Sequence, residues 1–412
     1  MYFCRTEDKG ILFNSSMKIQ SNFLLTVILV ISVFIGQAKD KDRISPGAES
    51  TDLYFPLLKG KNIAVVANHT AVLGHGHLVD SLVHSGFKVK RVFAPEHGFR
   101  GESGAGDKIA NGKDPVSGLP IISLYGKHLK PTAKDLEGIN VVIFDIQDVG
   151  VRFYTYISTL QYVMEACAEN HIKLIVLDRP NPNGHYVDGP VLNRKFSSFI
   201  GKQAVPVIYG MTIGEYAKML NGEKWLFKKV VCDLTVIPLG NYTHAKHYVL
   251  KIHPSPNLPE MDAVYLYPSV CFFEGTKISL GRGTTMPFRL IGYPGMKEAD
   301  TSFTPRSIKG VSENPPYKDT LCSGVSLANA GYSIRENGAI HLEWLIKMYK
   351  SYPAKEKFFT PFFTQLAGTD VLQKQIMAGK SEAEIKASWQ KDLSEFKKIR
   401  KKYLLYPDVL GN

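Results

Sequence analysis

The sequence of 412 residues predicts an α/β protein with a doubly wound parallel sheet and a second, smaller α+β domain. Short, entirely apolar runs such as Val141–Phe144 and Leu174–Leu177 are typical of strands buried on both faces of a parallel sheet. Stretches with apolar residues at helical spacing separate these runs, and strands that alternate with helices favour a parallel sheet. After about Pro259 the alternation stops and Tyr, Pro and Gly become dense, which indicates a second domain.

The expected elements of the first domain follow one another along the chain. Strands are expected at 62–68, 89–94, 141–144, 174–177 and 230–237. Helices are expected at 78–84, 155–170 and 212–220. The last of these begins with a capping box, in which Thr212 is the N-cap and Glu215 lies three positions on.

The second domain is expected to contain helices and a small sheet. Helical spacing predicts helices at 339–350 and 381–403, and Ser381 with Glu384 forms a capping box at the start of the latter. We expect the first domain to cover residues 39–259 and the second to cover 260–412, because the length is too great for one small domain.

The first 38 residues are expected to be a targeting segment. Phe23–Gly36 is uncharged and apolar, follows a lysine, and is shorter than the roughly 20 residues of a membrane-spanning helix. Met17 begins a conventional signal peptide, and small residues precede a cleavage point near Ala38. We therefore expect a periplasmic or secreted protein without a stable membrane span, the alternative being an uncleaved N-terminal anchor.

Composition limits the classes of partner. An apolar content of 44% and a charged content of 21% are ordinary globular values. The net charge of +12 suggests an anionic polymer or envelope surface as partner. For the basic run near the C-terminus, a solvated helix face is the simpler interpretation. No nucleic-acid partner is expected, and the sequence makes no prediction of oligomeric state.

Cysteine spacing does not support a zinc site. The five cysteines are far apart and form no CxxC pair. Cys167 and Cys232 lie in apolar surroundings and are expected to be small core residues. A disulfide between Cys271 and Cys322 is left open.

Several common catalytic and cofactor motifs are absent. No GxGxxG follows a strand, no complete phosphate-binding loop is present, and neither GxSxG nor HExxH occurs. We therefore expect no nucleotide cofactor and no metal. The remaining chemistry is that of carboxylates beside Arg, Asn and Tyr.

Polar residues gather where three expected strands end. Pro95 and Gly98 interrupt the first of them, in the loop Ala94–Asp107 (APEHGFRGESGAGD). Because the carboxyl ends of parallel strands meet at one edge, where α/β sheets bind ligands, these loops are expected to share one cleft. The polar residues of the three loops are Glu96 and His97; Asp145, Asp148, Arg152, Tyr154 and Tyr156; and Asp178, Arg179 and Asn181.

Carboxylates in pairs are what glycoside hydrolysis requires, one as proton donor and one ionised. Glu96 is the best acid candidate, because Phe93 and Phe99 would shield it and favour its protonated form. His97 is an alternative proton donor. Asp145 or Asp148 is the candidate for the second carboxylate, although helix capping or loop hydrogen bonding is the more common role for either aspartate taken alone.

Long motifs in this chain resemble the NamZ-type exo-β-N-acetylmuramidases, glycoside hydrolase family 171. The resemblance extends from about Asn62 to the C-terminus and rests on APEHGFRG, FDIQDVGVRFYTYISTL, LDRPNPNG, YGMTIGEYA, SPNLP, FEGT and GRGT. It implies a Rossmann-like N-terminal domain, a smaller C-terminal domain and an active cleft between them. It also implies that Glu96 is the catalytic glutamate and that no cofactor is needed.

The substrate implied by this resemblance carries a lactyl carboxylate, which needs a cation. Arg152, Arg179 and Arg282 are candidates because guanidinium binds carboxylate through two hydrogen bonds, and an internal ion pair is the alternative for each. Tyr154 and Tyr156 are expected to stack on sugar rings, or else to pack in the core. From the second domain, Glu274 and Arg282 are expected to complete the cleft.

The sequence thus predicts removal of terminal N-acetylmuramic acid from the non-reducing end of peptidoglycan fragments. One alternative is a muropeptide-binding protein without catalytic activity. Another is a metal-dependent phosphoesterase that uses Glu96, His97, Asp145 and Asp148.

Overall fold

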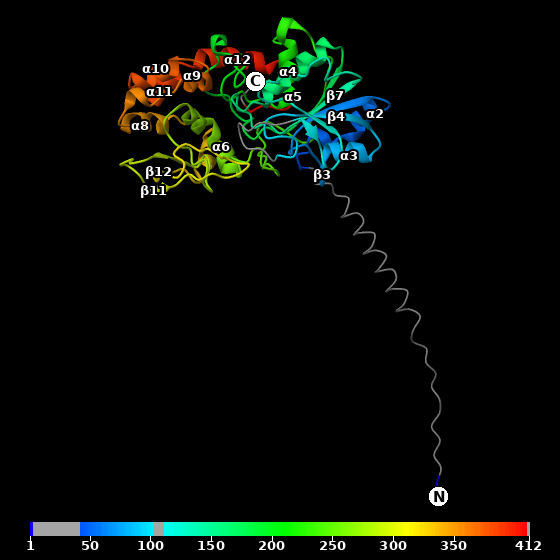
Figure 1. The fold of residues 1–412 in the computed structure, drawn as a ribbon, viewed down its shortest axis with the longest axis horizontal. Helices are drawn as coiled ribbons and strands as arrows, with labels where there is room; N and C mark the ends of the chain where they lie inside the picture. The colour runs from blue at the N-terminus through cyan, green and yellow to red at the C-terminus, as the bar shows by residue number, and fades with distance from the viewer. Residues whose placement is uncertain (3–41, 102–110, 410–412) are drawn as a thin grey trace. The chain divides into compact units, whose positions relative to one another are not determined.

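A parallel sheet organises the first half of the computed structural model, which describes residues 1–2, 42–101 and 111–409 (Figure 1). Within these residues the sheet has seven strands in the order β5-β6-β4-β1-β7-β8-β9, and only β5 is antiparallel to its neighbour. The bounds are β1 (Asn62–Ala67), β4 (Lys88–Ala94), β5 (Gly112–Lys113), β6 (Pro120–Ser123), β7 (Val141–Asp145), β8 (Lys173–Leu177) and β9 (Leu234–Ile237).

The six parallel strands have the order of a Rossmann-type sheet. Numbered along the chain they read 3-2-1-4-5-6, and the direction of winding reverses between β1 and β7. Register pairs Ile63 with Val141 and Val65 with Ile143 across this central position. The predicted doubly wound fold is confirmed, with β9 beginning at Leu234, four residues later than expected.

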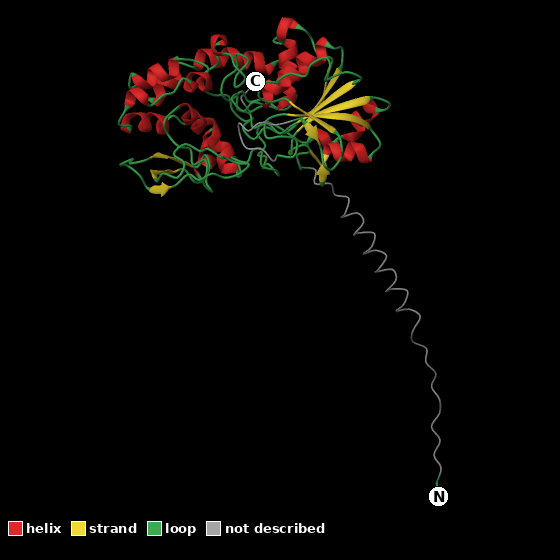
Figure 2. Ribbon diagram, viewed as in Figure 1, coloured by secondary structure: helices red, strands yellow, loops and turns green. Residues whose placement is uncertain are grey.

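Helices lie on both sides of the parallel sheet (Figure 2). Alternating side chains of the strands supply two separate apolar clusters, one for each face of the sheet. Phe144 and Val176 pack on one face with residues of α4 (Tyr156–Glu169) and α5 (Ile213–Gly222). On the opposite face, alternate residues of the same strands pack with α2 (Thr51–Leu58) and α3 (Leu78–His84). The predicted capping box of Thr212 and Glu215 is present at the start of α5.

The C-terminal part is made of short helices around a three-stranded antiparallel sheet of order β10-β12-β11. Its strands are β10 (Leu290–Tyr293), β11 (Thr301–Phe303) and β12 (Cys322–Ser326). Its helices are α6 (Met261–Val270), α7 (Ala330–Asn337), α8 (Glu343–Ser351), α9 (Phe362–Ala367), α10 (Val371–Met377), α11 (Glu382–Ala387) and α12 (Gln390–Lys401). The remaining short elements are β2 (Val72–Leu73), β3 (Gly76–His77), η1 (Gly47–Glu49), η2 (Arg194–Phe196), η3 (Phe227–Lys229), η4 (Cys271–Gly275) and η5 (Lys355–Lys357).

Two expected helices of the C-terminal part differ in extent from the prediction. The helix expected at 381–403 is divided into α11 and α12, because the Ser388 hydroxyl donates to the Ile385 carbonyl and competes with the helical pattern. Its predicted capping box of Ser381 and Glu384 is present. The helix expected at 339–350 begins at Glu343, where the Glu382 carboxylate accepts the first backbone N–H groups.

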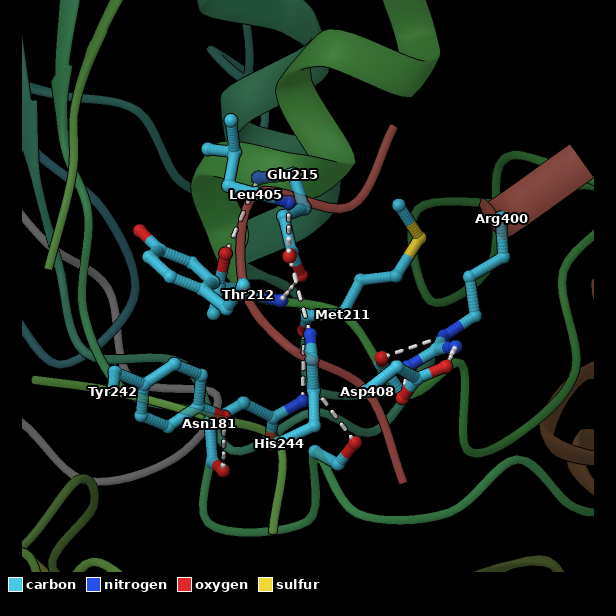
Figure 3. A network of polar contacts seen from close by, with 12 residues as sticks. Asn181, Met211, Thr212, Glu215, Tyr242, His244, Arg400, Leu405 and Asp408 are labelled. Carbon is cyan, nitrogen blue, oxygen red and sulfur yellow. Dashed lines mark hydrogen bonds and ion pairs between the residues drawn. The ribbon is translucent and has the colours of Figure 1, made fainter. Parts of the chain in front are cut away.

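The end of the chain returns to the first domain and packs beside α5 (Figure 3). The Leu405 amide donates to the Glu215 carboxylate at 2.8 Å, and the Tyr406 hydroxyl donates to Asp178 at 2.6 Å. Arg400, which is 2% exposed, binds Asp408 through two hydrogen bonds and donates to the Gly210 carbonyl. We call residues 400–408 the C-terminal strap.

The described residues from Ile44 onward form one compact unit, and one apolar cluster contains residues from both halves of it. The boundary predicted at residue 259 therefore stays a prediction. The predicted targeting segment lies outside the described residues, apart from residues 1 and 2. In the described part of the chain, no helix combines the length and apolar composition that crossing a membrane requires.

All four described cysteines are free and buried, so Cys271 and Cys322 form no disulfide. They belong to different apolar clusters, Cys322 packing with Leu290 and Phe303. Cys167 and Cys232 are core residues, as predicted.

Candidate active site

A cavity of about 540 Å³ opens beyond the carboxyl ends of β4, β6 and β7. Both halves of the chain line it, which places it between the sheet and the C-terminal helices. The sheet side contributes Glu96, His97, Tyr125, Tyr154, Thr155 and Tyr156. The C-terminal side contributes Tyr267, Cys271, Glu274, Arg282, Phe288 and Glu313.

Glu96 is held at the cavity wall by two hydroxyl groups. The Tyr125 hydroxyl donates to its Oε1 at 3.0 Å, and the Thr155 hydroxyl donates to its Oε2 at 3.2 Å. Tyr125 follows β6 and Thr155 precedes α4, so two neighbouring loops fix the orientation of one carboxyl group.

A tight turn directly after β4 sets the position of Glu96. The Gly98 amide donates to the Pro95 carbonyl at 3.1 Å, which closes a four-residue turn. Within this turn His97 has φ of 72°, a left-handed conformation that strains residues other than glycine. His97 itself is 4% exposed and lines the cavity beside Glu96.

Tyr154 and Tyr156 line the cavity as an edge-to-face pair with ring centroids 5.0 Å apart. The Tyr154 hydroxyl donates to the Pro254 carbonyl at 2.6 Å, and the Tyr156 hydroxyl accepts from the Asn68 side chain at 2.8 Å. Burial raises the pKa of both hydroxyl groups. They therefore form a rigid, neutral aromatic wall, and their stacking on a sugar stays a prediction.

Arg282 and Glu274 form the polar part of the opposite wall, as the sequence predicts for the second domain. Arg282 binds the Glu274 carboxylate through Nε and Nη2, and its guanidinium lies 4.8 Å from the centre of the Phe288 ring. Within the described residues no hydrogen bond uses its Nη1, which leaves donors for a ligand in the cavity.

Arg152, predicted to contact substrate, is instead a structural bridge. Its guanidinium is fully buried and donates at 2.8–2.9 Å to four backbone carbonyls. Two of these carbonyls, of Leu366 and Ala367, end α9 in the C-terminal part. The other two, of Pro190 and Val205, belong to the first domain, so Arg152 joins the two halves.

Asp145 and Arg179 do not line the cavity, so the structure does not bring Asp145 together with Glu96, and its catalytic role stays a prediction. They form a buried ion pair with hydrogen bonds of 2.5 and 2.8 Å at the position where the winding of the sheet reverses. The internal ion pair considered as an alternative is therefore the one present. A small cavity of about 50 Å³ beside Arg179 is separate from the large one.

Asp148, Asp178 and Asn181 hold loops together rather than facing the cavity. Asp148 accepts from the Gly150 amide at 2.7 Å and from the Tyr209 hydroxyl, and burial raises its pKa to about 7. Asp178 accepts from the Gly214 amide at the start of α5, and burial also raises its pKa to about 7. The Asn181 side chain donates to the Met211 carbonyl at 2.8 Å. None of the three lines the cavity, and their roles in catalysis and substrate binding stay predictions.

The predicted group of Glu96, His97, Asp145 and Asp148 is thus divided. Only the first two line the cavity, and Asp145 is neutralised by Arg179. Among the described residues, no three His, Cys, Asp or Glu side chains are grouped so that they could hold a metal ion.

Comparison with known proteins identifies the family to which the chain belongs. Residues 63–262 match the model described as "Exo-beta-N-acetylmuramidase NamZ, N-terminal", and residues 265–406 match the corresponding C-terminal model. The chain belongs to the NamZ family. The predicted family, and with it the prediction of a glycoside hydrolase, is confirmed.

Similar proteins cover nearly the whole chain. Peptidoglycan beta-N-acetylmuramidase NamZ of Bacillus subtilis (strain 168) is 37% identical over 389 residues, which are 90% of this chain and 93% of that protein. A solved DUF1343 family protein from Bacteroides fragilis is 49% identical, with a TM-score of 0.83, 89% of this chain covered and 100% of that chain. A second one from the same organism is 29% identical, with a TM-score of 0.77 and coverages of 89% and 99%.

The sequence reasoning missed some polar residues of this NamZ-family cavity. Tyr125 follows the apolar run of β6, and this position at a strand end was the available signal. Thr155 was assigned to the start of a helix, although it also reaches Glu96. Glu313 lies in a loop without periodicity, and no feature of the sequence distinguishes it from other surface glutamates.

Proposed function

We propose that this protein is an exo-acting glycoside hydrolase that removes N-acetylmuramic acid from the non-reducing ends of peptidoglycan fragments. The observation that carries the proposal is Glu96, a half-buried carboxyl group fixed by Tyr125 and Thr155 in a cavity with Arg282 on its opposite wall. Membership of the NamZ family supports the same substrate.

Glu96 is assigned as the general acid. Its proton passes to the glycosidic oxygen as the bond to the anomeric carbon breaks, so that the remaining saccharide leaves as a neutral alcohol. Tyr125 and Thr155 hold the carboxyl group in place and so act as positioning residues.

Arg282 is assigned to the lactyl carboxylate of the terminal sugar, because it lines the cavity and no hydrogen bond within the described residues uses its Nη1 donors. Glu274 orients this guanidinium through its two hydrogen bonds. Of the described carboxylates that line the cavity, Glu313 is then the one available for the ionised role, activation of water or stabilisation of the oxocarbenium ion.

Substitution of Glu96 tests the assignment. Glu96→Gln keeps the shape of the side chain but removes the proton, so turnover of a natural disaccharide should fall roughly 10²–10⁴-fold. A nitrophenyl muramide needs little protonation of its leaving group, and its turnover should fall much less. Equal, severe losses on both substrates would show instead that Glu96 is a nucleophile or an electrostatic stabiliser.

The binding-protein alternative is tested by the same assay. Release of nitrophenol in the presence of the wild-type protein at no more than the rate without protein would favour binding without catalysis. Glu313→Gln should lose turnover on both substrates alike, and an unchanged rate on both would remove Glu313 from the mechanism.

Export remains part of the proposal and rests on the apolar segment Phe23–Gly36. Sequencing the N-terminus of the protein recovered from outside the cytoplasm should give a chain that begins near Lys39. Recovery of a membrane-bound form that retains residues before Ala38 would contradict cleavage.

A further inference from the structure

A second cavity, of about 580 Å³, lies beside α4 and has no part in the mechanism above. We call it the α4 groove. The residues used in the argument below are Lys130, Gln161, Tyr162, Phe199, Lys202 and Trp225, all of which line it.

Three chain segments lead from the active-site cavity into the α4 groove. In α4, Tyr156 lines the first cavity and Tyr162 the second, about 9 Å further along the helix axis. After β6, Tyr125 lines the first and Lys130 the second. Phe199 lines both.

The α4 groove lies on the Glu96 side of the active-site cavity. Tyr125 and Thr155, which donate hydrogen bonds to Glu96, belong to two of the segments that continue into the groove. Arg282 belongs to the opposite, C-terminal wall. Since a general acid protonates the oxygen of the leaving group, the groove adjoins the place where the leaving saccharide lies.

The lining of the groove suits a saccharide. Tyr162 and Phe199 have nearly parallel rings, with an interplanar angle of 13° and centroids 6.3 Å apart. Trp225 is half-buried at the same site, while the Gln161 amide is already bonded to Glu165 and Gln203. Flat aromatic surfaces are suited to the C–H faces of pyranose rings.

The groove also contains a cation outside any ion pair. The Lys202 ammonium lies 3.9 Å from the centre of the Tyr162 ring and makes no ion pair within the described residues. The nearby carboxylates of Glu165 and Glu169 share Lys130 instead, at 3.6 and 2.8 Å. Lys202 is therefore available to an anionic group of a ligand.

The rim adds positive charge in a strained segment. Lys228 and Lys229, in η3 next to the groove, are exposed and have left-handed φ values of 52° and 57°. Strain of this kind persists where it serves a function, and lysines here favour an anionic polymer over a neutral glycan.

We propose that the α4 groove binds the leaving portion of the glycan, with Lys202 taking the lactyl carboxylate of the next N-acetylmuramic acid. This rests on the proposed function. In peptidoglycan every second sugar carries a lactyl carboxylate. When the carboxylate of the terminal sugar binds Arg282, the next lactyl carboxylate therefore lies two sugar rings further along the glycan, on the far side of Glu96. The site selects longer fragments by holding the product that leaves.

Kinetics on substrates of two lengths test the proposal. Lys202→Met should leave turnover of a nitrophenyl muramide within about twofold of wild type, since that substrate ends before the groove. For a trisaccharide with N-acetylmuramic acid at both ends, kcat/KM should fall roughly tenfold or more, as expected for a lost hydrogen bond to a charged group. Lys391→Met, at an exposed lysine of α12 that makes no ion pair among the described residues, is the matched control and should change neither.

Esterifying the inner lactyl carboxylate of the trisaccharide should impose the same loss on the wild-type protein and none on Lys202→Met. Equal losses on both substrate lengths, or none on the trisaccharide, would overturn the proposal. A wild-type protein inactive on both would count against the proposed function instead. In that event, calorimetric titration of the Glu96→Gln protein with the trisaccharide, with and without Lys202→Met, still decides the groove, because unchanged affinity overturns it.

Discussion

Arg152→Met should destabilise the folded protein by about 3–5 kcal/mol, because four buried carbonyls lose their donor at about 1–3 kcal/mol for each unsatisfied group, and the relief of burying the guanidinium offsets part of that sum. The guanidinium serves carbonyls of Pro190, Val205, Leu366 and Ala367, all at 2.8–2.9 Å. Methionine retains most of the apolar stem but leaves these carbonyls without that donor. At roughly 2 °C per kcal/mol for a chain of this size, the melting temperature should fall by about 8 °C.

Thermal unfolding followed by circular dichroism measures this effect. Arg306→Met is the control, because Arg306 pairs with Asp319 at 2.8 Å on the surface, with both side chains more than half exposed. Such a pair contributes about 0–1 kcal/mol, so the melting temperature should barely change. If Arg152→Met lowered stability no more than this control, the reasoning that Arg152 joins the two halves of the protein would be wrong.

Three further outcomes are expected. Tyr125→Phe removes one of the two hydroxyl donors to Glu96. Because the lost hydrogen bond contributes about 1 kcal/mol to holding the general acid in place, kcat on a natural disaccharide should fall roughly 5–10-fold. Asp148, with a folded pKa of about 7 against an ordinary value of 3.8, binds its proton more tightly when folded, so its contribution to stability should be complete below about pH 4 and be lost as pH rises through 7. Asp148→Asn should remove this part of the slope, measured by urea unfolding at pH 5 and pH 8. Asp408→Asn should lower stability by about 2 kcal/mol, because Arg400 is 2% exposed and would lose its carboxylate partner.

Each of these expectations has a result that would contradict it. An equal loss for Tyr125→Phe on the nitrophenyl substrate would mean that the hydroxyl does not act through the general acid. A pH slope that is the same with and without Asp148 would assign the titration to another group. Asp408→Asn with an unchanged melting temperature would mean that water or another acceptor replaces the carboxylate at Arg400.

The sheet was predictable because its signal is local. Val141–Phe144 and Leu174–Leu177 are apolar at every position, and only a strand covered on both faces requires that. The capping boxes of α5 and α11 were equally visible, because a serine or threonine with a glutamate three residues on has a direct structural meaning. The start of α12 could not be predicted, because Ser388 ends the preceding helix through a hydrogen bond that the spacing of apolar residues does not reveal.

The candidate site was predictable only in part. The ends of the strands identify the edge of the sheet at which ligands bind. They do not show which of the side chains at that edge reach the cavity. Asp145 and Asp178 end neighbouring strands on one side and became an ion-pair partner and a helix cap. Glu96 turned the other way, into the cavity. The partners of Arg152 are backbone carbonyls, which every residue carries, so no sequence pattern could predict them.

The C-terminal strap bears on the order in which the chain becomes stable during synthesis. The Glu215 carboxylate of α5 and the Asp178 carboxylate accept hydrogen bonds from Leu405 and Tyr406, which lie 190 and 228 residues further along the chain. Until the strap has been synthesised, these two buried acids lack part of their hydrogen bonds, and missing bonds of this kind oppose folding. The first half of the protein is thus expected to reach full stability only after the strap has joined it, which makes any fusion or cleavage near Asp408 a change to the core of that first half.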